Sequence, residues 1–206
     1  MSAFHTMPGK PRRSLLARLR ASNDGVAAVE FAYLAPLMLL MFAGAFELSR
    51  AIGTDRRFSI ITAMTGDLVA REKDVDEEKL KGMMKAIDHV MQPYDPSTLQ
   101  IGVISVQVEK NIAKVKWAFS HNQAPVPAKC SNVSTDDVPP GLVADGGSVI
   151  LVKSKYTYAP FFVNYDEMAK IFEGKLNWED KSTHTPRGVS CVGDASDKTC
   201  SQYCEN

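Results

Sequence analysis

The longest apolar run in the chain reads GVAAVEFAYLAPLMLLMFAGAF, residues 25–46, and its one charged residue is Glu30. Residues 26–46 number 21, and at about 1.5 Å per residue they form a helix of about 31 Å, close to the hydrocarbon thickness of a bilayer. Pro36 would bend a soluble helix, but such a proline is tolerated in membrane helices. A buried soluble helix of this length usually has a polar face, and this run has none beyond Glu30. The run therefore predicts a transmembrane helix.

The charges on either side of the run predict its orientation. Five basic residues and one acid precede residue 26, whereas residues 47–57 hold three basic residues and two acids. In membrane proteins the cytoplasmic side carries the excess of lysine and arginine. We therefore expect a basic cytoplasmic leader at residues 1–25, the transmembrane helix at 26–46 and an extracytoplasmic α+β domain at 47–206.

The composition of the chain suits one anchor and one globular domain. The chain has 206 residues, of which 45% are apolar, and its formal net charge is zero. This length leaves room for a single domain after the anchor. Because no basic face is apparent, we expect no nucleic acid among its partners.

The four cysteines all lie on the side assigned to the exterior: Cys130, Cys191, Cys200 and Cys204. An even number of cysteines in an oxidising compartment predicts two disulfides, which here would tie down the C-terminal region. Four cysteines allow three pairings, and the sequence leaves the choice open. Zinc is the alternative, but the spacing lacks a C-x-x-C pair and only His184 is near. We expect disulfides, with no metal and no other cofactor.

The segment after the anchor predicts two helices. Apolar residues spaced by three to four continue over residues 51–71, although Gly53 and Gly66 weaken the expectation of one uninterrupted helix. A second helix is expected at residues 76–91, where acids open the first turn and Pro93 follows the end.

Segments rich in valine and isoleucine then predict a small antiparallel sheet. Its strands are expected at residues 99–109, 112–120 and 148–158. The first two are close enough in sequence to form a hairpin. In the second strand, apolar residues alternate with Lys114 and Lys116. A short helix is expected at 163–172, and the polar chain after Lys181 is expected to be irregular.

The motif Gly25-Val26-Ala27-Ala28-Val29-Glu30-Phe31 resembles the processing site of type IV pilin-like proteins. In those proteins a membrane aspartyl peptidase cuts after the glycine, and glutamate is the fifth residue of the mature chain. The aromatic Phe31 and the small residues before Glu30 are similar to the tight-adherence (Tad/Flp) branch, and residues 25–40 are most similar to its TadE-like minor pseudopilins. The similarity lies mainly in the first 50 residues, and it continues more faintly to residue 158.

This resemblance implies a minor pseudopilin that supports assembly of a tight-adherence type IV pilus. Prepilin peptidase would cut between Gly25 and Val26, and Glu30 with Phe31 would form the assembly and processing motif. The implied partners are the membrane, prepilin peptidase, other pilins or pseudopilins and the pilus assembly machinery. The implied location is the bacterial inner membrane, as a single-pass protein with its C-terminal domain in the periplasm and an association with the pilus. Flp-type major pilins are little more than an anchor helix, so the long domain of this chain favours a minor role.

Charge pairing gives Glu30 a role in this interpretation. A cut after Gly25 frees the α-amino group of Val26, a cation at neutral pH, four residues from Glu30. An unpaired carboxylate near the membrane costs about 2.5 to 3.5 kcal/mol, and an ammonium group offsets part of that cost. The resemblance implies that Glu30 meets the terminal amine of a neighbouring subunit. The alternative is that Glu30 only reaches toward the interface.

Two other interpretations of the N-terminus remain. In the first, Ala43-Gly44-Ala45 is the cleavage site of a secretory signal peptide, which would release a disulfide-stabilised binding domain after Ala45. That signal would be about 45 residues long rather than roughly 15 to 30, and it would carry Glu30 in its apolar core. In the second, the chain is an unprocessed single-pass membrane protein.

Catalytic patterns find little support in the sequence. The histidines are scattered: His5, His89, His121 and His184. No nucleophile-elbow, zinc-protease, phosphate-loop or Rossmann pattern occurs. The Asp74-x-Asp76 pair lacks the glycine and distal glutamate of a calcium loop, so helix capping is the better interpretation. We expect no enzyme and assign no catalytic residue.

Overall fold

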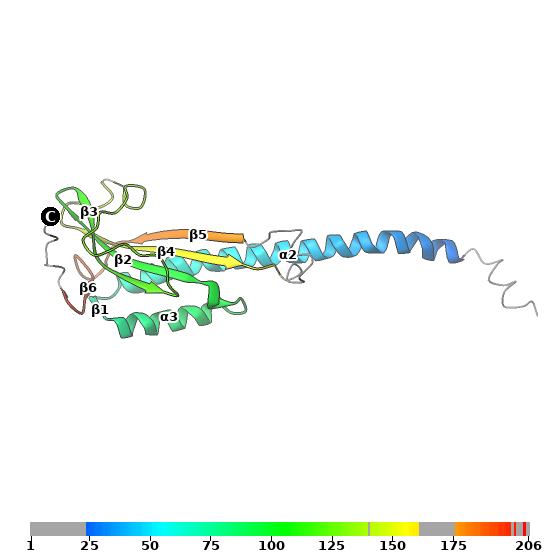
Figure 1. Cartoon of the computed structure of the whole chain (residues 1–206), viewed down its shortest axis with the longest axis horizontal. Coiled ribbons are helices and arrows are strands. Elements are labelled where there is room, and N and C mark those ends of the chain that lie inside the picture. Colours follow the sequence, from blue (N-terminus) through cyan, green and yellow to red (C-terminus); the bar gives the residue numbers. More distant parts are fainter. Residues whose placement is uncertain (1–23, 140, 161–175, 199, 201–203, 205–206) are drawn as a thin grey trace, which may run out of the picture. The chain divides into compact units, whose positions relative to one another are not determined.

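The computed structural model describes residues 24–139, 141–160, 176–198, 200 and 204. The chain divides into two compact units, the first ending at Phe46 and the second beginning at Glu47. The expected α+β class is confirmed by a long N-terminal helix, a second helix, a small antiparallel sheet and two disulfides (Figure 1). The short helix expected at 163–172 lies outside the described residues.

Helix α2 (Asp24–Ala70) continues without a break through Pro36 and contains both helical segments expected before residue 71. Within the described ranges it is the one helix long and apolar enough to cross a membrane, and its most apolar stretch has a mean hydropathy of 2.0. None of that stretch is buried within the protein.

The sheet of the second unit has the strand order β3-β2-β4-β5, with every neighbouring pair antiparallel. Its strands are β2 (Gln100–Glu109), β3 (Ile112–His121), β4 (Ser148–Tyr158) and β5 (Leu176–His184). The first three confirm the expected strands. The irregular chain expected after Lys181 begins only at residue 185, because β5 pairs with β4 as far as His184, opposite Ile150. Backbone pairing extends this polar strand although its sequence shows no apolar alternation.

One face of the sheet is covered by α3 (Glu77–Met91) and by the C-terminal part of α2 (Figure 1). Asp76 caps α3, since its carboxylate accepts a hydrogen bond of 2.7 Å from the backbone N–H of Lys79, and the expected capping role is confirmed. The core on this side includes Phe58, Ile61, Met84, Ile87, Ile101, Val103, Ile150 and Val152. This packing unites helix, helix and sheet in one hydrophobic core.

The opposite face of the sheet packs against the loop that links β3 to β4. Its smaller core contains Ile104, Val106, Val115, Val138, Val149 and Leu151. A β-bulge separates Trp117, which pairs with Ser105, from Val115, which pairs with Val106, so that Lys116 is the extra residue. Trp117 consequently joins the helix-side core while Val115 joins the opposite one. The alternating apolar residues of β3 therefore face two different cores, which the alternation in the sequence did not indicate.

Two glycines in α2 allow the close contacts that hold this helix to the rest of the second unit. A Cβ at Gly53 would lie 2.9 Å from the hydroxyl of Tyr94, and a Cβ at Gly66 would lie 2.3 Å from Cδ2 of His184. The two residues that weakened the helix expectation are thus packing positions, and the helix is continuous through both.

Candidate functional site

The residues of the predicted processing motif lie in the first two turns of α2. Gly25, Val26, Glu30 and Phe31 are all exposed, and nothing lies within 4 Å of a Cβ built on Gly25. Val26 and Glu30 are four residues apart in a helix, so they lie on the same side one turn apart. The fold therefore leaves the motif accessible and places the two residues with the relevant charges close together.

The segment that follows is apolar on every side of the helix. Its large apolar side chains between Val26 and Phe46 are each between 43% and 80% exposed. A helix that is apolar all round is stable only where lipid or other protein surrounds it. This N-terminal helix accordingly fits membrane anchoring.

Beyond Phe46, one exposed apolar stripe continues along α2 into the second unit. It consists of Leu48, Ile52, Ile60 and Met64, which are 39% to 62% exposed. Each step of four residues turns by about 40°, so the four side chains spread over the exposed half of the helix, with the exposed Arg56 between Ile52 and Ile60. The buried residues Phe58, Ile61 and Thr65 fall on the other side. We call these four residues the α2 stripe.

The buried side of α2 is fixed to the sheet and to α3 by polar contacts. The guanidinium of Arg57 donates hydrogen bonds to the carbonyl of Val90, at 2.9 Å, and to that of Gln92. These carbonyls end α3, so a cation there both satisfies them and interacts favourably with the helix dipole. Ser182 in β5 donates a hydrogen bond of 3.0 Å to the carbonyl of Thr62. The stripe is therefore presented on a helix that the domain holds in place.

Two further polar contacts of α2 involve groups with shifted pKa values, Asp67 and Tyr158. The hydrogen bond that Arg71 donates, together with the charge of Arg187, lowers the pKa of the Asp67 carboxyl below its ordinary value of 3.8. Burial, followed by the hydrogen bond to Glu47, raises the pKa of the Tyr158 hydroxyl. Both contacts are thus formed with Asp67 charged and Tyr158 protonated at neutral pH.

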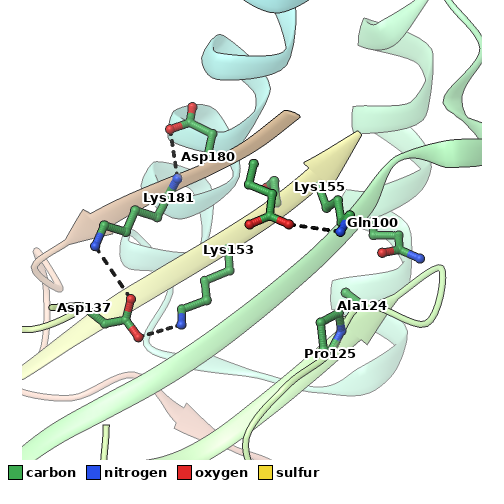
Figure 2. A pocket seen from close by; sticks show the side chains of 10 residues that line it. Gln100, Ala124, Pro125, Asp137, Lys153, Lys155, Asp180 and Lys181 are labelled. Atoms are coloured by element: carbon green, nitrogen blue, oxygen red, sulfur yellow. Dashed lines mark hydrogen bonds and ion pairs between the residues drawn. The ribbon is translucent and has the colours of Figure 1, made fainter. Parts of the chain in front are cut away.

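An open groove of about 420 Å³ crosses the face of the sheet that the helices leave free. Figure 2 shows that its lysines are paired with acids. Lys153 and Lys181 approach Asp137, at 2.5 and 3.7 Å, and Lys155 lies 3.0 Å from Glu179. Because these charges neutralise one another, the groove shows no preference for an anion or a cation.

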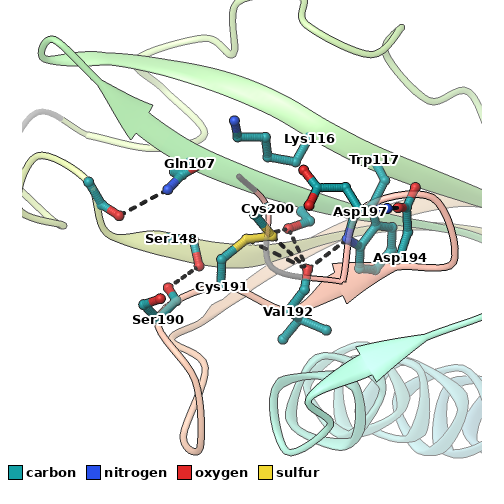
Figure 3. The surroundings of a disulfide bond; sticks show 12 residues. Gln107, Lys116, Trp117, Ser148, Ser190, Cys191, Val192, Asp194, Asp197 and Cys200 are labelled. Carbon is teal, nitrogen blue, oxygen red and sulfur yellow. Dashed lines mark hydrogen bonds between the residues drawn. A yellow bond between two sulfur atoms is a disulfide. The ribbon is translucent and has the colours of Figure 1, made fainter. Parts of the chain in front are cut away.

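Two disulfides close the C-terminal part of the second unit: Cys130–Cys204 and Cys191–Cys200. The expected disulfides are confirmed, and the fold decides the pairing that the sequence left open. Cys191 and Cys200 are buried, at 4% and 6% exposure. Beside them the indole N–H of Trp117 donates a hydrogen bond of 2.8 Å to the carbonyl of Val192 (Figure 3). The shorter disulfide loop thus covers the part of the sheet that the helices do not reach.

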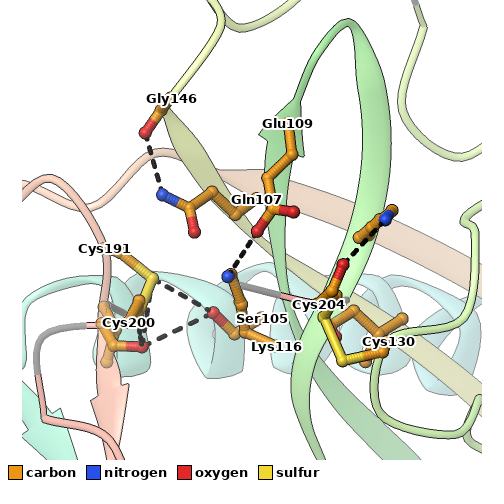
Figure 4. Close-up of polar contacts among 12 residues, drawn as sticks. Ser105, Gln107, Glu109, Lys116, Cys130, Gly146, Cys191, Cys200 and Cys204 are labelled. Atoms are coloured by element: carbon orange, nitrogen blue, oxygen red, sulfur yellow. Dashed lines mark hydrogen bonds and ion pairs between the residues drawn. A yellow bond between two sulfur atoms is a disulfide. The ribbon is translucent and has the colours of Figure 1, made fainter. Parts of the chain in front are cut away.

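The same region contains a buried ion pair that sequence analysis missed. The Nζ atom of Lys116 lies 2.5 Å from Oε1 of Glu109, with the two side chains only 5% and 12% exposed (Figure 4). The bulge in β3 positions Lys116, which lies near Asp197 and Cys200. A lysine between the apolar residues Val115 and Trp117 is the signal that could have suggested a buried charge.

Comparison with known proteins matches residues 25–59 to the family of TadE-like proteins. The N-terminal segment of this chain is similar to TadE-like proteins. This is the family that the processing motif resembled. No protein of curated function and no solved structure matches the chain.

The TadE-like segment contains every residue of the predicted processing motif together with the first half of the α2 stripe. The histidines of the following domain occupy separate places. His121 approaches Asp88 at 3.2 Å, His89 contacts the carbonyl of Lys85, and His184 packs against Gly66. Among the described residues, no group of three or more His, Cys, Asp or Glu side chains could hold a metal ion.

Proposed function

We propose that this chain is a minor pseudopilin that supports assembly of a tight-adherence type IV pilus after prepilin peptidase cuts between Gly25 and Val26. The carrying observation is that Glu30 lies exposed at the head of an apolar helix, five residues after Gly25, within the TadE-like match. The motif and the charge fall within two helical turns, at the start of the span that the family model matches.

The position of the cut explains how Glu30, whose charge is costly beside an apolar segment, takes part in assembly. Gly25 is the second residue of α2, in the turn whose backbone N–H groups lack helical partners, so little structure must open for a peptidase to reach it. The new amine of Val26 then offsets the carboxylate of Glu30 in an apolar environment. In a growing assembly, the amine of an incoming or neighbouring subunit supplies the positive charge that pairs with Glu30. This pairing sets how deeply the subunit inserts.

The α2 stripe supports assembly rather than simple anchoring. Leu48, Ile52, Ile60 and Met64 are exposed apolar side chains of the second unit. An anchor that only held the domain to a bilayer would need no such stripe beyond the membrane, where exposed apolar surface is unfavourable. Packing against the helices of other pilins covers it.

The disulfides support a location outside the cytoplasm. Both lie in the unit that begins at Glu47, and structural disulfides persist in oxidising compartments such as the bacterial periplasm. The chain is then a single-pass protein of the inner membrane with its domain in the periplasm. No enzymatic activity is part of this proposal.

A secreted binding domain is the second candidate function, because an apolar helix near an N-terminus also fits a signal sequence. The first residue of the mature protein, isolated from cells and sequenced, separates the candidates. A start at Val26 supports the pseudopilin, a start at Phe46 overturns it in favour of secretion, and an intact leader leaves an unprocessed membrane protein.

Substitution of Glu30 by alanine tests the pairing mechanism. We expect cleavage to continue and pilus assembly to fall, measured by immunoblot of the processed chain and by counting pili. Normal piliation in the variant would discard the pairing.

The α2 stripe is tested by Ile60→Gln, with the neighbouring exposed Ser59→Gln as matched control. Both changes are on the surface, so the free energy of unfolding should move by less than about 0.5 kcal/mol. Only Ile60→Gln should reduce assembly. Equal effects of the two variants would show that the stripe does not pack against another pilin.

A further inference from the structure

Strand β3 is one edge of the sheet, and only part of that edge is covered. Along its first half, Val115 exchanges backbone hydrogen bonds with Cys130 and Ser131, and Ala113 accepts one from Val133. Between Trp117 and Ser120, no backbone hydrogen bond to a segment other than β2 is present among the described residues. Within the part of the chain that the structure describes, the second half of β3 therefore presents backbone groups without a strand partner, which are a template for another strand.

The open half of β3 lacks the charges and prolines that usually prevent edge pairing, although the bulge at Lys116 lies at its start. Residues 117–120 read Trp-Ala-Phe-Ser, without a charge or a proline. The other edge strand, β5, carries Glu179, Asp180 and Lys181 in succession. Charged side chains on an edge oppose the approach of further strands. The sheet is thus protected at β5 and open at β3.

A groove of about 410 Å³ runs beside this open edge. Its walls are the edge itself, Val75, the start of α3 with Leu80, and the turn after β6 (Gly193–Asp194). Of its three carboxylates, that of Glu77 is paired with the amine of Lys81 at 2.6 Å. Those of Asp76 and Asp194 accept hydrogen bonds from neighbouring N–H and O–H groups and keep their negative charge in the groove. The groove therefore favours a positively charged occupant.

We propose that the open edge of β3 docks an extended, cationic segment of a partner protein, which adds to the sheet as a further strand. Main-chain hydrogen bonds to residues 117–120 supply affinity, and the acidic groove selects positive side chains. A second copy of this chain is disfavoured as occupant, because two such edges would bring their Asp76, Glu77 and Asp194 carboxylates together. This inference stands apart from the proposed pilus function, since it uses no residue of the TadE-like segment.

The test uses the full chain in micelles of a zwitterionic detergent and a fluorescent, blocked peptide of alternating lysine and valine. Binding is measured by anisotropy, and hydrogen exchange with mass spectrometry locates the protected amides. We expect slower exchange in the segment that contains residues 117–120. A peptide of alternating glutamate and valine should bind at least about tenfold more weakly at low salt. Its carboxylates repel those of the groove, whereas the lysines of the first peptide are attracted to them.

Two variants identify the site. Ser120→Lys adds a charge at the open edge and should weaken binding of the lysine peptide at least about fivefold, whereas Thr183→Lys on the exposed edge strand β5 should not. The double variant Glu77→Gln with Asp194→Asn keeps the shape of the groove and should weaken binding about tenfold.

Three outcomes overturn the proposal. The first is equal binding of the lysine and glutamate peptides, and the second is protection of amides away from β3. The third is self-association of the chain, by analytical ultracentrifugation, that Ser120→Lys abolishes, because a second copy would then occupy the edge.

Discussion

Replacement of Gly66 by alanine should destabilise the second unit although alanine is the better helix former. In the interior of a helix this change alone contributes about 1 kcal/mol of stability. At Gly66, however, the new Cβ would lie 2.3 Å from Cδ2 and 2.9 Å from Nε2 of His184. Overpacking of this kind typically costs about 1 to 3 kcal/mol. Because the contact is well inside normal van der Waals separation, we place the cost at the upper end and expect a net loss of about 1 to 2 kcal/mol.

Gly82 in α3 provides a matched control, because nothing lies within 4 Å of a Cβ built there. Gly82→Ala should therefore stabilise the protein by about 0.5 to 1 kcal/mol. The same substitution in two helices of one domain is thus expected to have opposite signs. The difference between them, about 2 to 3 kcal/mol, measures the contact with His184.

The assay is urea unfolding of the full chain in detergent micelles, followed by tryptophan fluorescence. Trp117 is buried, and Trp178 stacks on Tyr158 with ring centroids 5.2 Å apart, so both report loss of the second unit. A shift of the midpoint at constant slope is a change in stability. His184→Ala in the Gly66→Ala background removes the ring and should make the alanine favourable again. The reasoning is refuted if Gly66→Ala and Gly82→Ala shift the midpoint equally.

Three further predictions use the same unfolding assay. Glu109→Gln should cost about 2 to 4 kcal/mol because it breaks the buried pair with Lys116, and a cost below about 0.5 kcal/mol would contradict burial of that pair. Removal of the Cys130–Cys204 disulfide, which spans 74 residues of sequence, should cost about 4 kcal/mol by loss of loop closure in the unfolded chain; an unchanged midpoint would contradict it. The lowered pKa of Asp67 means that its stabilising contribution is complete above about pH 5 and is lost as the pH falls further. The difference in midpoint between the parent chain and Asp67→Asn should therefore shrink toward zero as the pH falls below about 5, and a constant difference would show that the carboxylate charge has no part in it.

The elements predicted correctly are those whose signal is local. An unbroken apolar run indicates the anchor, a stripe with acids in the first turn indicates α3, and segments rich in β-branched residues indicate β2 and β4. In each case the side chains of one short segment decide which face is buried. The number of disulfides also followed from composition and compartment.

The candidate site divides in the same way. The processing motif is predicted from sequence alone because its residues are consecutive, from Gly25 to Phe31, and it stays a prediction. The α2 stripe could not be separated from core positions, because Ile60 and Ile61 are both apolar and only the packed sheet makes one exposed and the other buried. The open edge of β3 likewise depends on which strands lie beside it.

By itself, the sequence determined the long apolar helix, α3 and three strands of this chain, because these depend on the periodicity of neighbouring residues. It also predicts the processing motif, which stays a prediction. The tertiary structure alone decided the cysteine pairing, the polar strand β5, the change of face at Lys116 and the purpose of Gly66. These features arise where segments far apart in sequence come into contact. Such contacts produce no periodic pattern in the sequence of either segment. Gly66 lowers the helix propensity of its own segment, yet the fold requires it because His184 packs where a side chain would stand.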